Sequence, residues 1–235
     1  MSPNYFVSRF GSFLQLFAAV LPEERFEYNG DEQGHGQTVA DTPRQIKSIL
    51  EQCRTLLEKE EFSDAVVMSN FFLADIGKKE LVRQIINETK ISLGAATFIP
   101  QPPADGYAVS AEIWAMKEKD INRQGQAPVK WFFTGDVRSD EPPVGAYARS
   151  LNAFQKIASQ MRQNGFAAGQ LLRTWIYQGH LVLPEGNTQR YKELNRARTD
   201  FFHGVAFLEE HLPHGYCGST IYPASTGIGA DDVDV

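Results

Sequence analysis

The sequence predicts an α/β (α+β) protein made of two tandem units, the second of which lacks its final strand. Residues 43–116 follow the order amphipathic helix, apolar strand, helix and a pair of strands. Residues 129–235 begin with a short apolar strand and repeat helix, strand, helix and a further strand-like segment before an acidic tail. Repetition at this scale decides architecture, because each copy needs a partner to cover its sheet. We therefore expect a first unit at 1–118, a linker at 119–128 and a second unit at 129–235, with ligand sites in the seam between copies.

Composition sets limits on partners and location. The net charge is −6, from 29 acidic and 23 basic residues, so a long phosphate backbone is a poor partner. Only two cysteines are present, which excludes a disulfide framework and favours the cytoplasm. Cys53 lies on an apolar helical face and is interpreted as a small buried side chain. No apolar run reaches the roughly 18 residues that a membrane span needs.

The first unit opens on an aromatic segment, Tyr5–Leu21, which we interpret as one or two strands. Gln15 interrupts this run and Pro22 is followed by two glutamates, which argues against a signal peptide. A polar loop at 27–38 precedes a helix predicted over 43–60. Its apolar residues recur at i, i+3, i+4 and i+7: Ile46, Ile49, Leu50, Cys53, Leu56 and Leu57.

The remaining elements follow from similar patterns. Ala65–Leu73 is a near-continuous apolar run, typical of a strand covered on both faces, and Lys78–Lys90 is a second helix. The prolines within 99–103 indicate a bend, and Tyr107–Met116 alternates as a strand does.

The second unit is predicted to contain the following elements: a strand at Val129–Thr134, a loop at Ser139–Gly145, a helix at Tyr147–Asn164, a strand at Leu171–Tyr177, a helix at Thr188–Phe202 and a glycine-punctuated segment at 222–229. Val233 and Val235 are interpreted as the first residues of the missing strand. This interpretation implies either a fragment or a strand supplied by another subunit.

Glu112 is the first candidate for chemistry. It lies within the alternating strand, on the face that also carries Ser110 and Trp114. Two interpretations stay open: a solvated residue on an exposed face, or a carboxylate held in a pocket that suits it to deliver or take a proton.

Two arginines are candidates for ligand binding. Arg173 alternates with Trp175 and Tyr177 on one face of its strand, and Arg198 falls on an apolar helix stripe where a charge is costly unless paired. Either these arginines pair with the chain's own carboxylates, or they converge to hold the carboxylates of a small acid.

The remaining motifs give weaker indications of function. His211, His214 and Cys217 offer ligand types that zinc accepts, but they lie in a predicted loop with no matching second pair, so we expect no metal. The glycine-rich nucleotide motifs and the G-x-S-x-G elbow are absent, and we expect no cofactor. Gly227 and Gly229 alone indicate a turn.

These segments resemble a known superfamily. The helix–strand–helix run of the first copy and its AEIWAM strand (111–116) resemble one unit of the reactive-intermediate deaminase (Rid/YjgF) superfamily. The segments LRTWIY (172–177), RYKELNRARTDFF (190–202) and YPASTGIG (222–229) are similar to its tandem-unit branch, which includes chorismatases. The resemblance implies chorismate-mutase-like units, assembled as a homo-oligomer or pseudo-trimer, with ligand clefts between neighbouring units.

The resemblance also implies roles for residues. Chorismatases protonate the enol ether of chorismate with a C-terminal glutamate, which here would lie beyond Val235, while arginines hold the substrate carboxylates. Arg173 and Arg198 fit that binding role, and Glu112 matches the last-strand carboxylate of the deaminases and is the expected catalytic residue. The expected substrate contacts are Arg173, Arg198, Tyr177, Tyr191, Ser225 and Thr226.

The sequence is therefore compatible with three functions. The leading hypothesis is an enzyme, or the remnant of one, that hydrolyses an enol ether of a small carboxylated metabolite with acid assistance. The second is a non-catalytic small-molecule binder. The third, imine or enamine deamination, is disfavoured, because the deaminases' substrate arginine is replaced by Ala95-Ala96-Thr97 in the first copy and Ala224-Ser225-Thr226 in the second.

Overall fold

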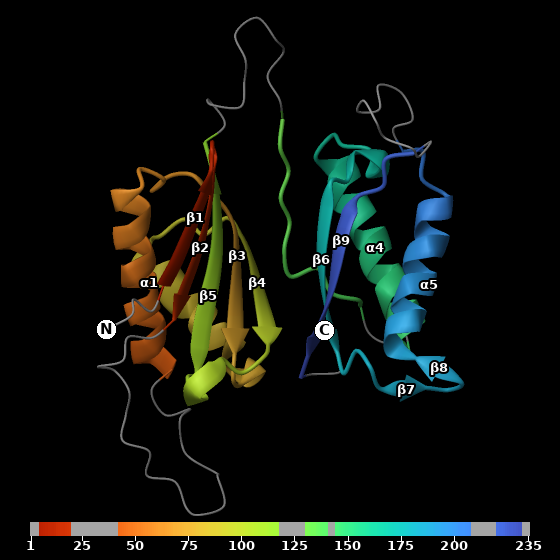
Figure 1. The fold of residues 1–235 in the computed structure, drawn as a ribbon, viewed down its shortest axis with the longest axis horizontal. Helices are drawn as coiled ribbons and strands as arrows, with labels where there is room; N and C mark the ends of the chain where they lie inside the picture. Colours follow the sequence, from red (N-terminus) through yellow and green to blue (C-terminus); the bar gives the residue numbers. More distant parts are fainter. Residues whose placement is uncertain (1–4, 20–41, 118–129, 141–143, 208–219, 232–235) are drawn as a thin grey trace, which may run out of the picture. The chain divides into compact units, whose positions relative to one another are not determined.

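The structure, a computed structural model, describes residues 5–19, 42–117, 130–140, 144–207 and 220–231 (Figure 1). The chain divides into two compact units, Met1–Asp136 and Val137–Val235. Each unit is described by itself.

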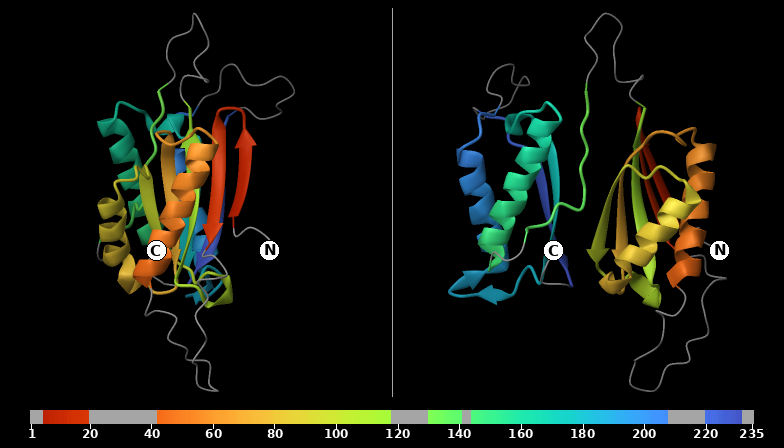
Figure 2. Two further views of the ribbon diagram at one scale, coloured as in Figure 1. Left: turned by 90° about the vertical axis from the view of Figure 1, so that its left-hand side faces the viewer. Right: turned by 180° about the vertical axis from the view of Figure 1, so that it is seen from behind.

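The first unit is a five-stranded sheet with two helices on one face (Figure 2). The strand order is β1-β2-β5-β3-β4, in which β3 and β4 are parallel and the other neighbours antiparallel. The helices predicted at 43–60 and 78–90 and the strands predicted within 5–21, 65–73 and 107–116 are present, whereas Ile99 and Pro100, predicted to lie in a bend, end β4. The elements are β1 (Tyr5–Phe10), β2 (Phe13–Ala19), α1 (Thr42–Lys59), β3 (Val66–Leu73), η3 (Ile76–Lys78), α2 (Lys79–Thr89), β4 (Ala95–Pro100), η4 (Ala104–Gly106) and β5 (Val109–Met116).

Side-chain periodicity explains how this sheet is covered. The apolar stripe predicted for α1 is buried, and it packs against one face of the strands. On β5, Val109, Ala111, Ile113 and Ala115 join this core, so the alternate residues, Glu112 among them, lie on the opposite face. We call that opposite face the open face of the sheet, because no described helix of this unit covers it, although residues 131–136 pack on part of it. It carries Phe6, Ser8 and Phe10 of β1, Phe13, Gln15 and Phe17 of β2, Ser110, Glu112 and Trp114 of β5, Met68, Asn70 and Phe72 of β3, and Ala95, Thr97 and Ile99 of β4.

Cys53 gives a first testable consequence of this packing. Its side chain is buried in the core, as the sequence predicts, and burial raises the pKa of the thiol to about 12. Thiolate formation in the folded protein is therefore suppressed near pH 8, and the thiolate is the form that reacts with alkylating reagents. We expect iodoacetamide to modify Cys53 at pH 8 only after denaturation. Peptide mapping checks this, and rapid labelling of Cys53 in the native protein would contradict the packing of α1.

The strand predicted at Val129–Thr134 is not formed: the described residues 130–140 take part in no sheet. The aromatic residues in this segment suit a strand, but a strand also needs a hydrogen-bonded neighbour. Here the segment packs on the first unit through its side chains. Trp131 lies edge-on to Phe13, with ring centroids 6.0 Å apart, and the Asp136 backbone N–H donates to Thr97 Oγ1 over 3.0 Å. Residues 130–136 thus belong to the first compact unit, although the sequence division assigned them to the second.

The second unit places two helices against a two-stranded parallel sheet (Figure 1). Its elements are α4 (Ala146–Gln163), η5 (Ala168–Gln170), β6 (Arg173–Gly179), β7 (Pro184–Glu185), β8 (Thr188–Gln189), α5 (Arg190–His203) and β9 (Ala224–Ala230). The predicted helix starts two residues later than expected, because Thr188 and Gln189 pair with Pro184 and Glu185 as a short hairpin. Aromatic side chains fill the space between the helices, where Phe154 of α4 stacks on Phe201 of α5 at 5.4 Å.

The two units share an order of elements. α1–β3–α2–β4 in the first and α4–β6–α5–β9 in the second are both helix, strand, helix, strand, and both strand pairs are parallel. Within the described residues, the second sheet has no counterpart of β5, and Val233 and Val235, which were predicted to begin that strand, lie outside the described residues. The described part of the second sheet also has no counterpart of β1 and β2.

No helix within the described residues is both long and apolar enough to cross a membrane.

Candidate ligand-binding site

The two faces of the β6–β9 sheet carry different groups. An added Cβ at Gly227 would come within 3.2 Å of the Tyr191 ring and 3.9 Å of Leu194, both on α5. The Gly227 position therefore faces this helix. Because side chains alternate along a strand and Gly227 pairs with Ile176, Thr174 and Ser225 face the helix as well. Arg173, Trp175, Tyr177 and Thr226 then lie on the other face, which we call the Arg173 face.

Arg173 is held in place by two neighbours on this face. Its Nη2 donates to Thr226 Oγ1 over 2.7 Å, and its guanidinium carbon lies 4.9 Å from the centroid of the Trp175 ring. Register explains the contact, since Trp175 pairs with Thr226 across the parallel ladder. The hydroxyl and the indole together restrict the guanidinium plane, so that less freedom is lost when it binds a planar anion.

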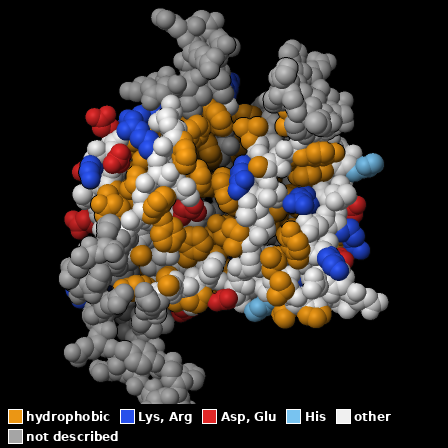
Figure 3. All heavy atoms as spheres, viewed as in Figure 1, with side chains coloured by type: hydrophobic (Ala, Val, Ile, Leu, Met, Phe, Trp, Pro, Cys, Tyr) orange, Lys and Arg blue, Asp and Glu red, His pale blue; other side chains and the backbone are white. Residues whose placement is uncertain are grey.

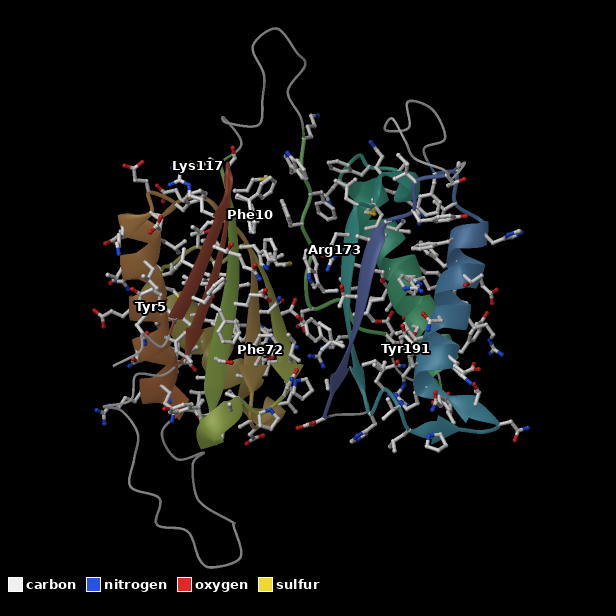
Figure 4. The ribbon with its side chains drawn as sticks, viewed as in Figure 1. Tyr5, Phe10, Phe72, Lys117, Arg173 and Tyr191 are labelled. Carbon is white, nitrogen blue, oxygen red and sulfur yellow. The ribbon has the colours of Figure 1, made fainter. Side chains whose placement is uncertain are left out.

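The charge of Arg173 has no partner in the described part of the chain. No described Asp or Glu oxygen lies within 4.0 Å of its nitrogens, and the residue is exposed. A guanidinium offers five N–H donors, and only one of them is bonded to Thr226. The remaining donors are available to a carboxylate. Figure 4 shows Arg173 on the side of the strands away from α4 and α5.

The predicted convergence of the two arginines does not occur within the second unit. Arg198 is on α5, where its Nη2 donates to the Asn195 side-chain carbonyl over 2.8 Å, whereas Arg173 is on the face turned away from that helix. Sequence periodicity could not reveal this separation, because it does not say which face of β6 the helix covers. The predicted substrate contacts divide in the same way: Tyr177 and Thr226 share the Arg173 face, while Tyr191 and Ser225 lie on the helix side, where the Thr174 hydroxyl donates to the Ser225 hydroxyl over 3.0 Å.

Glu112 lies on the open face of the first unit, at the middle of the sheet. Gln15 Nε2 donates to its Oε1 over 2.7 Å, Asn70 Nδ2 to its Oε2 over 2.9 Å, and Trp114 Nε1 to its Oε1 over 3.1 Å. These donors come from all three central strands, β2, β3 and β5. The neighbours are only partly predictable. Trp114 shares an alternating strand with Glu112, but Gln15 and Asn70 are 97 and 42 residues away in sequence.

In all three hydrogen bonds, Glu112 is the acceptor. An ionised carboxylate only accepts hydrogen bonds, whereas a protonated one turns one oxygen into a donor. The network therefore fits the ionised form and orients it, and it does not favour a group that delivers a proton. The sequence left two interpretations of Glu112 open, a solvated surface residue and a carboxylate held in a pocket. Its side chain is only partly buried, so neither interpretation describes it fully.

Metal binding finds no support in the described residues, where no cluster of three or more His, Cys, Asp or Glu side chains is arranged to hold an ion. His211, His214 and Cys217 lie outside the described residues.

No protein-family model matches the chain. No curated protein matches it at the significance required. The chain is similar in structure to several solved proteins over about half of its length. One, described as a proposed translation initiation inhibitor from Salmonella typhimurium, is 15% identical, with 47% of this chain and 87% of that chain covered and a TM-score of 0.35.

A proposed endoribonuclease from Thermotoga maritima is 15% identical, with 48% and 84% covered and a TM-score of 0.36. A proposed endoribonuclease L-PSP from Entamoeba histolytica is 17% identical, with 49% and 92% covered and a TM-score of 0.32. At this identity and TM-score, the likeness carries no argument about chemistry.

Proposed function

We propose that this protein binds a small carboxylated metabolite on the Arg173 face of its second unit. The observation that carries this proposal is a guanidinium fixed by Thr226 and Trp175, with no described carboxylate as its counter-ion. The ligand carboxylate accepts from the remaining N–H donors of Arg173, in the bidentate geometry that arginine favours. The rest of the ligand lies against Trp175, which shares this face and is half-buried, whereas Tyr177 on the same face is buried.

We further propose that the two units are tandem copies of one Rid-like module. The shared helix–strand–helix–strand order and the parallel pairs β3–β4 and β6–β9 support this. Within the described residues, the second copy then differs from the first by lacking counterparts of β1, β2 and β5. Assembly into a homo-oligomer stays a prediction.

Hydrolysis of the chorismatase type is a weaker candidate for this chain. It requires a proton donor, and the three N–H groups around Glu112 favour a carboxylate that accepts. It also requires two arginines on one substrate, and Arg173 and Arg198 lie on different sides of the β6–β9 sheet. Deamination is disfavoured as before, since β4 carries no arginine. We therefore favour ligand binding over catalytic turnover as the function of this protein.

Replacing Arg173 by methionine is the direct test. The methionine keeps most of the aliphatic stem over Trp175 and removes every donor and the charge. Hydrogen bonds to charged groups contribute about 1.5–3 kcal/mol, so we expect affinity for a carboxylate to fall by about 10- to 100-fold. Isothermal titration with benzoate, pyruvate and chorismate as probes measures this. Arg173→Lys keeps the charge without the planar fork and should give an intermediate loss.

Arg162→Met is the matched control, because Arg162 is an exposed arginine of the same unit, on α4. Its affinity for the same probes should equal that of the wild type. Equal binding by the wild type and Arg173→Met would overturn the proposal. Release of pyruvate from chorismate, assayed in the same samples, would place turnover ahead of binding.

A further inference from the structure

The open face of the first unit carries a carboxylate among aromatic rings. Phe6, Phe10 and Phe17 are exposed on it by 62%, 65% and 40%, although they are large apolar side chains. Phe10 and Phe72 lie on the side of the strands away from α1 (Figure 4). In the space-filling view, hydrophobic side chains gather over the strands of this unit, whereas acidic and basic ones concentrate toward its helix side (Figure 3). Glu112 is therefore an acidic group within an apolar surface.

The hydrogen bonds of Glu112 leave one acceptor position available. A carboxylate has about four lone-pair sites, two on each oxygen. Oε1 accepts from both Gln15 and Trp114, whereas Oε2 accepts from Asn70 alone. Within the described residues, the second position on Oε2 has no donor.

The charge of Glu112 is also uncompensated in the described residues. Its three partners are neutral amide and indole groups, and no described Lys, Arg or His nitrogen lies within 4.0 Å of it. Neutral donors orient a carboxylate without cancelling its charge. A negative charge that is partly removed from water and lacks a counter-ion attracts a cation more strongly than a surface carboxylate does.

Two aromatic rings flank this position. Phe17 pairs directly with Glu112 across β2 and β5, and Phe72 follows Asn70 by two residues on the same face of β3. The Phe17 and Phe72 rings approach each other to 6.3 Å between centroids. The face of either ring attracts a cation that is bound within about 6 Å of its centroid.

We propose that this face binds a small organic cation, in which a primary ammonium donates to Glu112 Oε2 and the attached apolar group lies on Phe17 and Phe72. Charge complementarity selects the cation, and the flat aromatic surface selects an apolar body next to it. This site uses residues of the first unit only. It is independent of carboxylate binding at Arg173, and either proposal stands if the other fails.

The test uses benzylamine, which is cationic at pH 7, and benzyl alcohol as its neutral counterpart of similar shape. Titration of the full chain, followed by NMR, should show benzylamine binding at least about tenfold tighter than benzyl alcohol. Glu112→Gln keeps the size and one carbonyl acceptor, and should remove this preference. Glu51→Gln, which removes one negative charge from the exposed side of α1, should leave it unchanged.

A second variant guards against misfolding of Glu112→Gln. Phe17→Leu keeps the carboxylate and its donors, and should weaken benzylamine by about 2- to 5-fold, and by more than benzyl alcohol, because only the cation is attracted by the ring face. Equal binding of the two probes to the wild type would overturn the proposal, and so would benzylamine binding that survives both variants. If benzylamine does not bind and the chain instead self-associates in a way that Phe10→Ser abolishes, the face is an interface between copies and the proposal is wrong.

Discussion

Replacing Phe71 by alanine should destabilise the first unit by about 3–5 kcal/mol, the usual loss for a buried phenylalanine. Phe71 is fully buried on the helix-facing side of β3, and its ring stacks on Phe98 of β4 with centroids 5.6 Å apart. Truncation removes the buried ring and leaves a cavity between the sheet and its helices, which close packing prevents from collapsing fully. Amide hydrogen exchange of β3 and β5 in denaturant measures the loss within this unit.

The matched control for this prediction is Phe6→Ala, the same substitution at a ring exposed by 62% on β1. It should change the stability by no more than about 0.5 kcal/mol. Equal effects of the two substitutions would show that the helix-facing side of the sheet is not the core.

Replacing Gly94 by alanine should be about as damaging, with a loss of at least about 3 kcal/mol. Gly94 has φ +60, and an added Cβ would lie 2.3 Å from both the carbonyl carbon and the oxygen of Val67. Val67 lies at the register shift between Val66 and Met68, so the backbone there is already held by the β3–β5 ladder. The clash is with backbone atoms, which cannot rotate away as a side chain can. Thermal unfolding of the variant measures the effect.

Gly11→Ala separates the clash from the conformational cost. Gly11 has a similar φ of +57 in the β1–β2 turn, but nothing lies within 4 Å of its added Cβ. Only the left-handed conformation is then penalised, by about 1–2 kcal/mol. If Gly94→Ala is no worse than Gly11→Ala, the close approach of Gly94 to the Val67 backbone is incorrect.

Elements with a strong internal period were predictable from the sequence. The stripe from Ile46 to Leu57 identified α1, and alternation from Tyr107 to Met116 identified β5 and put Glu112 on the face away from the core. Both patterns report burial directly, since one face of a helix or strand must be apolar.

Contacts between distant segments were not predictable in the same way. The donors to Glu112 depend on the register of β2 and β3 against β5, which no local pattern specifies. The separation of Arg173 from Arg198 depends on which face of β6 is turned to α5. Trp131 has the β propensity of a strand residue, but the segment that contains it packs through its side chains instead of pairing. The predicted site in the seam between copies stays a prediction.

The central claim is that Arg173 holds a ligand carboxylate, and an NMR titration of the arginine side chains tests it most directly. The Nε–H resonance of Arg173, assigned by its absence in Arg173→Met, is followed while benzoate is added. The account predicts a saturable shift of this resonance and no shift of the corresponding resonance of Arg162. Unchanged Arg173 resonances at benzoate concentrations that saturate binding elsewhere on the chain would contradict it.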